Sequence, residues 1–163
     1  MKRHRSLVPL SRDHHDGLIL AQRLILGRSR APRSDWPTDR RQQVSRVIEF
    51  FKTDLRKHFE AEEAHVFPAA VDHLREGADL ARQLIEEHDD MRARIRGFEK
   101  DPTTNLDERL SSFGERLKEH IKKEESILFE RIQEEMDPAD LEVVGVRLRT
   151  LYPSDSDGSY CRT

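Results

Sequence analysis

The residues best suited to chemistry are two histidines, each followed four positions later by a glutamate, in a repeated stretch of sequence. The pattern F-x3-L-x2-H-x3-E-E-x3-F occurs twice, at an offset of 62 residues. It contains His58 with Glu62 in one copy and His120 with Glu124 in the other. Side chains four residues apart project from the same face of a helix, close enough to share one ligand. The repeat therefore predicts two equivalent pairs of metal-ligating side chains.

An apolar seam leads into each pair. Residues spaced three and four apart form the seam, which is typical of a buried helix face. They are Val44, Ile48, Phe51 and Leu55 in the first copy, and Leu106, Leu110, Phe113 and Leu117 in the second. A carboxylate in such a face suffers a large desolvation cost unless a cation compensates it. Bound metal ions are the simplest source of that charge for Glu62 and Glu124.

Further histidines lie in two other apolar seams. His88 shares one face with Leu80, Leu84, Met91, Ile95 and Phe98. His14 and His15 are adjacent, and neighbours on a helix point about 100° apart, so we expect only one of them to face inward. The apolar residues around them do not decide which. Four imidazoles with two bridging carboxylates would give each of two metals two nitrogens and two oxygens, a donor set that suits iron, with manganese or zinc as alternatives.

Four long helices must position these side chains. Apolar periodicity and the breaks between periodic segments predict helices over 9–28, 38–74, 77–99 and 105–136, with Pro68 expected to kink or interrupt the second. Short connections favour an up-down antiparallel four-helix bundle, an all-α fold. A short extra C-terminal helix reaches residue 151. We predict one domain over 1–151, with its core at about 8–136, and a disordered tail over 152–163.

Composition excludes several classes of protein. Of the 163 residues, 37% are charged and 35% are hydrophobic, which is enough apolar material for a single core. The net charge is −3 and the basic residues are dispersed, so we expect no nucleic-acid partner. The longest apolar run has only four residues, which predicts no membrane partner, no signal peptide and a cytoplasmic location. One cysteine, Cys161, can form no disulfide within the chain.

These motifs resemble the hemerythrin-like, HHE cation-binding family. The matching segments are DHHDGLIL, HFEAEEAHVFP, EEHDDM and HIKKEESILFE, within about residues 8–136. The resemblance implies a bundle that holds two non-haem iron ions joined by carboxylates and by an oxo or hydroxo bridge. It implies a set of six metal ligands: His15, His58, His88 and His120 as terminal ligands, and Glu62 and Glu124 as bridges. His15 is preferred to His14 because aliphatic residues follow it three and four positions on.

The third predicted helix departs from the family pattern. Oxygen-carrying hemerythrins present two histidines four residues apart there, whereas Leu84 and Arg92 stand four before and four after His88. We therefore predict a metal-binding protein that interacts with dioxygen or a related small oxidant in binding, sensing or iron and oxygen homeostasis, rather than an enzyme. Two alternatives stay open. One is a di-iron enzyme that scavenges peroxide or nitric oxide, and the other is a zinc-bound or metal-free interaction module.

Two other pairs of polar residues, Glu62 with His65 and Glu86 with Glu87, are assigned no chemical role of their own. A ferritin-like di-iron bundle would need two E-x-x-H pairs, and only Glu62 with His65 forms one. The acidic pair Glu86 and Glu87 is interpreted as part of a solvated helix face.

Overall fold

Helices account for all the regular structure in the residues that the computed structural model describes, 2–152. The three segments labelled η are π-helical. In chain order the elements are α1 (Val8–Leu26), α2 (Arg40–Phe50), η1 (Phe51–Leu55), α3 (Arg56–Ala61), η2 (Glu62–Val66), α4 (Phe67–His73), α5 (Gly77–Lys100), α6 (Leu106–Lys123), η3 (Glu124–Leu128), α7 (Phe129–Glu135) and α8 (Pro138–Leu151). The predicted tail, with Cys161, lies outside the described residues except for Tyr152.

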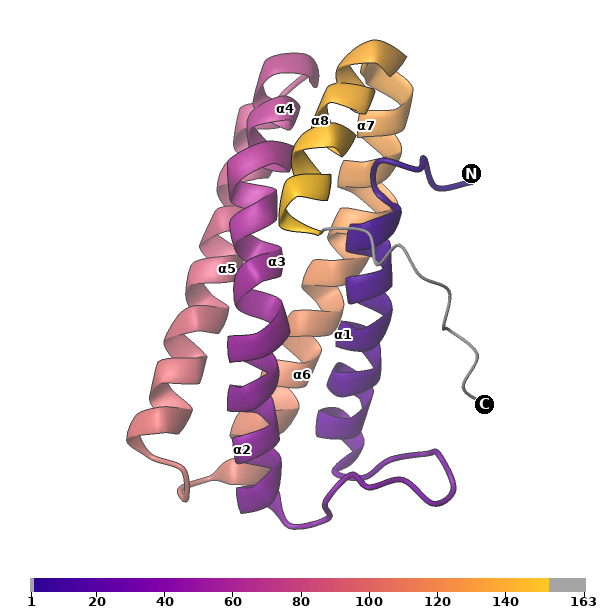
Figure 1. The fold of residues 1–163 in the computed structure, drawn as a ribbon. Coiled ribbons are helices and arrows are strands. Elements are labelled where there is room, and N and C mark those ends of the chain that lie inside the picture. The colour runs from indigo at the N-terminus through magenta and orange to yellow at the C-terminus, as the bar shows by residue number, and fades with distance from the viewer. Residues whose placement is uncertain (1, 153–163) are drawn as a thin grey trace.

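Four long rods form the bundle, because successive α-helical and π-helical segments follow one another without a break. The first rod is α1, the second runs from α2 to α4, the third is α5, and the fourth runs from α6 to α7. Neighbouring rods run in opposite directions, and α8 lies against α3, η2 and α7 (Figure 1). The predicted all-α four-helix bundle with an extra C-terminal helix is confirmed. No helix within residues 2–152 is long and apolar enough to cross a membrane.

Pro68 leaves the second rod continuous. It occupies the first turn of α4, where a missing N–H is tolerated, and η2 ends directly before that turn. A π-helical segment, η3, stands at the same place in the other copy of the repeat, where the residue equivalent to Pro68 is Glu130, so a proline is not required for it.

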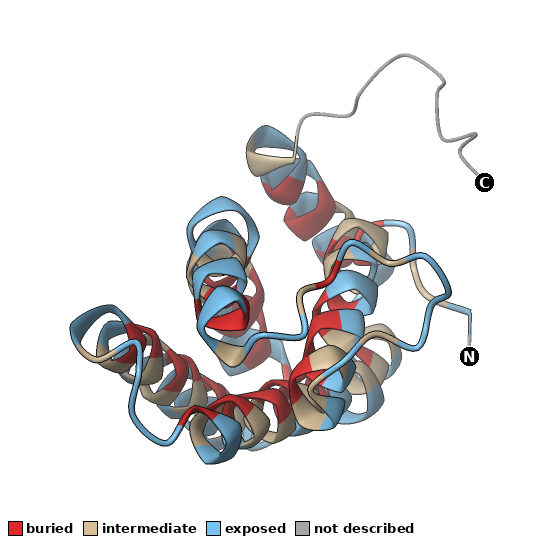
Figure 2. Cartoon of the chain, turned by 90° about the horizontal axis from the view of Figure 1, so that it is seen from below, coloured by how far each residue is buried: buried red, intermediate tan, exposed pale blue. Residues whose placement is uncertain are grey.

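The core consists of two apolar clusters with a layer of polar side chains between them. One cluster lies toward α4, α7 and α8, and the other lies toward α2 and the N-terminal half of α6. Along α5, Leu84 belongs to the first cluster and Met91 to the second, and His88 lies between them. Seen along the bundle, the buried residues line the faces that the rods turn toward one another (Figure 2).

Small residues allow α1 and α6 to approach closely along most of their length. A Cβ atom added at Gly114 would lie 2.8 Å from the carbonyl oxygen of Ala21, and one added at Gly17 would lie 2.8 Å from the Cδ1 atom of Ile121. Both distances are shorter than ordinary van der Waals contact. This close contact fixes which face of α1 points into the bundle.

Candidate metal centre

Six titratable side chains form the polar layer between the two apolar clusters. Each has at most 3% of its surface exposed. The first rod contributes one of them, the second two, the third one and the fourth two: His14, His58, Glu62, His88, His120 and Glu124. Ions buried this deeply must be compensated by partners of opposite charge.

The Nε2 atoms of the four imidazoles surround the two carboxylates. His14 lies 3.0 Å from Glu124, and His58 lies 3.3 Å from Glu62. On the other side, His88 lies 3.4 Å from Glu62 and His120 lies 3.2 Å from Glu124. Each carboxylate therefore faces one imidazole from each side of the layer.

The side chains divide into two groups of four donors that share both glutamates. One group contains His14 and His58, the other contains His88 and His120, and the ligand atoms of each group lie within 4.8 Å of one another. Donor atoms about 2.1 Å from one ion stand about 3.0 to 3.4 Å apart in octahedral or tetrahedral geometry. The imidazole-to-carboxylate distances match that spacing, so each group fits one metal ion.

Unsatisfied polar atoms concentrate in this layer. Eight buried side-chain nitrogen and oxygen atoms of the described residues make no hydrogen bond, and five of them are both oxygens of Glu62, both oxygens of Glu124 and Nε2 of His14. They face imidazoles and carboxylates of the same layer in ion pairs of 3.0 to 3.7 Å that lack hydrogen-bond geometry. A buried polar atom without a hydrogen bond costs about 1–3 kcal/mol. Two metal ions would satisfy all five atoms at once.

Four outer carboxylates bind the imidazoles at their other nitrogen. In each case a carboxylate oxygen lies 2.7 to 3.0 Å from Nδ1. The pairs are His14 with Glu125, His58 with Asp13, His88 with Glu63 and His120 with Glu87. A carboxylate on Nδ1 keeps a proton there, so that Nε2 can bind a metal once its own proton is lost, and it also fixes the direction of the ring.

The outer carboxylates link the four rods into a closed ring. Asp13 of the first rod binds the imidazole of the second rod, and Glu63 of the second rod binds that of the third. Glu87 of the third rod binds the imidazole of the fourth, and Glu125 of the fourth binds that of the first. Each of these carboxylates is adjacent in sequence to a side chain of the polar layer.

A family comparison agrees with this geometry. The family model described as the hemerythrin HHE cation-binding domain matches residues 7–132, more than three quarters of the chain. The chain belongs to the hemerythrin HHE cation-binding domain family. Comparisons with curated proteins and with solved structures gave no match. The matched segment contains every residue of the polar layer, whereas α8 lies beyond it.

The HHE domain brings together five of the six side chains predicted from sequence, and the sixth needs a correction. His58, Glu62, His88, His120 and Glu124 lie in the polar layer, whereas His15 is exposed to solvent. His14 occupies the position expected for His15.

The wrong choice between the adjacent histidines has a physical reason. The buried face of α1 steps through Leu10, His14, Gly17, Ala21 and Leu24, whereas Ile19, which favoured His15, is 38% exposed. Two of the positions after His14 are small because α6 packs closely there. A search for large aliphatic residues therefore misses the buried face.

The outer carboxylates were not predicted from sequence, and one prediction about them is wrong. Glu87 was assigned to a solvated face, yet its side chain is 14% exposed and binds both His120 and Lys123. Glu86 is exposed, as expected. The signal in the sequence is an acidic residue beside each ligand, and it is weak because acidic residues are abundant in this chain.

In the structure, as in the sequence, the third rod lacks the second histidine that oxygen-carrying hemerythrins have there. Leu84 is fully buried in an apolar cluster and provides no donor. Arg92 lies 2.8 Å from Glu63, the outer carboxylate of His88. The third rod of this HHE domain thus supplies one imidazole to the polar layer, together with a cation behind it.

Charges in the polar layer stabilise one another when protons take the place of metal. Burial alone would lower the pKa of His58 and His120, but neighbouring carboxylates outweigh burial and raise both pKa values to about 9. Burial and the charge of Glu62 would raise the pKa of Glu124, yet His120 and His14 lower that pKa to about 2. A metal must therefore displace protons from the imidazoles in order to bind.

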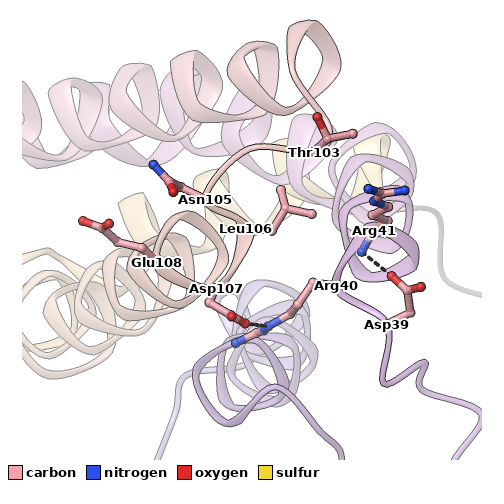
Figure 3. A pocket seen from close by; sticks show the side chains of 8 residues that line it. All are labelled: Asp39, Arg40, Arg41, Thr103, Asn105, Leu106, Asp107 and Glu108. Atoms are coloured by element: carbon pink, nitrogen blue, oxygen red, sulfur yellow. Dashed lines mark hydrogen bonds and ion pairs between the residues drawn. The ribbon is translucent and has the colours of Figure 1, made fainter.

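A surface hollow of about 500 Å³, whose lining residues are drawn in Figure 3, has no part in the centre. It lies at the opposite end of the bundle from α8 (Figure 1). It is lined by Asp39, Arg40, Arg41, Thr103, Asn105, Leu106, Asp107 and Glu108. Arg40 lies 2.7 Å from Asp107, and the Asp39 carboxylate accepts a hydrogen bond from the backbone N–H of Arg41. The hollow is about 20 Å from His120 along α6, at 1.5 Å per residue.

Proposed function

We propose that this HHE domain binds two iron ions and interacts through them with dioxygen or a related small oxidant. Binding, sensing or iron and oxygen homeostasis is the role we infer. The observation that carries the proposal is the set of four buried carboxylate oxygens, on Glu62 and Glu124, that lack hydrogen bonds at the meeting point of four imidazoles. When bound, the irons would supply redox chemistry and open coordination positions.

The donor set of the chain supports iron. Each group offers two imidazole nitrogens and carboxylate oxygens from both glutamates, without thiolate. Imidazole and carboxylate ligands with free positions are typical of non-haem iron sites. Four protein donors fill a tetrahedral zinc site completely, whereas iron with five or six ligands keeps a position for a small molecule.

The packing around the polar layer suits the binding of a small oxidant. The apolar clusters on either side exclude bulk water, and stacked Phe59, with its ring centroid 3.7 Å from that of His88, closes one face of the layer. The outer carboxylates hold the imidazole rings in place before any metal arrives. The single imidazole from the third rod favours sensing or handling of an oxidant over reversible oxygen carriage.

The proposal is tested by reconstituting the metal-free protein with ferrous iron under anaerobic conditions, followed by metal analysis and a visible spectrum before and after exposure to air. We expect two irons per chain and a new visible absorption band after exposure. A chain that takes up no iron, or that takes up iron and shows no spectral change on exposure to air, would contradict the proposal.

A double variant supplies the control for specific uptake. Glu62→Gln with Glu124→Gln keeps the size of both side chains but removes both charges, so we expect it to bind no more than traces of iron. The matched control replaces exposed acidic residues of the same chain, Glu60→Gln with Glu119→Gln. Turnover of added peroxide or nitric oxide by the iron-loaded protein would instead favour a scavenging enzyme.

A further inference from the structure

Tyr152, at the end of α8, has a buried hydroxyl group, although it lies beyond the segment that matches the family model. It follows the last turn of α8, and its backbone N–H donates a hydrogen bond to Leu148. The Oη atom is withdrawn from solvent and makes no hydrogen bond. An O–H group buried in this way costs about 1–3 kcal/mol, so its position calls for an explanation.

The surroundings of Tyr152 point to the His58 side of the centre. The ammonium group of Lys57 lies 4.6 Å from the centre of the Tyr152 ring, and Lys57 directly precedes His58. Burial, followed by the charge of Asp13, raises the pKa of the Tyr152 phenol. Asp13 is the outer carboxylate that binds Nδ1 of His58 at 3.0 Å.

Asp13 differs from the other three outer carboxylates of the polar layer. Each of those has a cation beside it: Arg92 beside Glu63, Lys123 beside Glu87, and Arg3 beside Glu125. Among residues 2–152, Asp13 forms an ion pair with His58 and with no Lys or Arg. One of its oxygens, Oδ2, binds His58, which leaves Oδ1 free to accept a hydrogen bond.

We propose that Tyr152 is a positioning residue of the metal centre, whose hydroxyl donates a hydrogen bond to Asp13 and so steadies the acceptor of the His58 imidazole. This inference rests on the proposed function, because it assigns Tyr152 a role only when His58 binds a metal. Tyr152 then takes the place of the Lys or Arg that backs each other outer carboxylate. It also makes α8 part of the centre rather than a mere cover for the bundle.

A purely structural role makes different predictions. If Tyr152 only anchored α8, the packing of its ring would stabilise that helix, because an O–H without a partner contributes nothing favourable to the stability of the metal-free fold. Loss of the hydroxyl alone would then leave metal retention unchanged. If the hydroxyl acts through Asp13, loss of the hydroxyl must weaken metal binding by His58.

The test compares Tyr152→Phe with Tyr160→Phe, the same change at the only other tyrosine of the chain. Wild type and both variants are loaded with ferrous iron anaerobically, and release of iron to an excess of a coloured chelator is followed over time. A neutral hydrogen bond contributes modestly, so we expect Tyr152→Phe to release one of its two irons about threefold to tenfold faster than wild type. Tyr160→Phe should match wild type.

Two further measurements separate the role of the hydroxyl from a general loss of stability. In an Asp13→Asn background, the added Tyr152→Phe change should accelerate iron release no further, since the path through Asp13 is already broken. The melting temperature of metal-free Tyr152→Phe should equal or exceed that of metal-free wild type.

Each contrary result has its own meaning. Equal release from wild type and Tyr152→Phe, with both holding two irons, would overturn the role of Tyr152 and leave the proposed function intact. An equal loss of melting temperature with and without metal would also overturn it, because the residue would then be only structural. A wild-type chain that binds no iron would overturn the proposed function, and this inference with it.

Discussion

At the scale of single residues, both nitrogens of each imidazole in the polar layer are in use. Nε2 faces the buried glutamates, and Nδ1 binds an outer carboxylate from another rod. Every outer carboxylate therefore contacts an imidazole on a different rod from its own. Substituting an outer carboxylate on one rod should therefore alter the imidazole that it binds on the next rod.

Glu87→Gln tests this dependence at His120. Glutamine keeps the size of the side chain but removes the charge that holds the proton on Nδ1, and losing such a partner typically weakens metal binding about 10- to 100-fold. Iron affinity, measured by competition with a chelator, should fall by that factor. Glu86→Gln is the matched control, because Glu86 is exposed and lies outside the ring. Equal affinities for the two variants would refute a role for the outer carboxylates.

His14→Ala and His15→Ala test the assignment on α1. His14 is 3% exposed and lies 3.0 Å from Glu124, whereas His15 points to solvent. Removing a direct ligand should cost more than the loss of an outer partner, so we expect His14→Ala to lower iron affinity more than about 100-fold. His15→Ala should bind two irons as wild type does, and the reverse result would restore the choice made from sequence.

At the scale of elements, the two repeated rods change helix type where they supply their glutamates. η2 begins at Glu62 and η3 begins at Glu124, the equivalent positions of the repeat, and in both the carbonyl oxygen of the glutamate accepts from the N–H five residues on. Such π-helical turns inside α-helices are frequent at functional sites. The repeat thus preserves a backbone feature as well as the side chains, which supports two equivalent bridging positions.

Gly114→Ala tests the close contact of α1 with α6. The new Cβ would lie 2.8 Å from the backbone oxygen of Ala21, which has no flexible end to move aside. We expect the free energy of unfolding to fall by about 1–3 kcal/mol, as is usual for overpacking. Gly97→Ala is the matched control: its Cβ meets nothing closer than 3.7 Å, so helix propensity should make it neutral or stabilising by up to about 1 kcal/mol. Urea unfolding measures both, and equal effects would contradict the contact.

The sequence predicts the rods and most of the centre because each depends on a local pattern. Apolar seams mark the rods, and the repeat marks His58, Glu62, His120 and Glu124. The choice of His14 depends instead on how closely α6 packs against α1, a contact between residues about 100 positions apart. The ring of outer carboxylates depends on pairings between rods as well, so neither could be predicted from helical spacing.

At the scale of the whole molecule, a charged layer divides the core of this small bundle. The apolar residues of the core lie in two clusters, one on each side of the polar layer. Holding two carboxylates there requires positive charge, from imidazolium ions when metal is absent and from metal when it is present. Stability should therefore depend on pH and on metal.

The pH dependence of the metal-free protein follows from the histidine pKa values. His58 and His120 have pKa values of about 9 when folded, above the value of about 6.5 for an unfolded chain. Their contribution is fully present below pH of about 6.5 and is lost as the pH rises through about 9. Urea unfolding should give a free energy more than about 1 kcal/mol lower at pH 9.5 than at pH 6. Equal free energies at the two values would contradict this account.

Bound metal should raise the stability of the folded protein above that of the metal-free protein. Because the ligands join all four rods, binding to the folded chain alone raises the free energy of unfolding by about 2.7 kcal/mol at a metal concentration 100 times the Kd. We expect the iron-loaded protein to melt at a higher temperature than the metal-free protein, and the double variant Glu62→Gln with Glu124→Gln to show no such gain. Identical melting temperatures for loaded and metal-free wild type would argue against a shared centre.

The most direct test of the central claim is a crystal structure of the iron-loaded protein with anomalous diffraction measured at the iron edge. We expect two iron peaks, one bound by His14 and His58 and the other by His88 and His120, with Glu62 and Glu124 shared between them. A single peak, no peak between the two apolar clusters, or iron bound by His15 would contradict it.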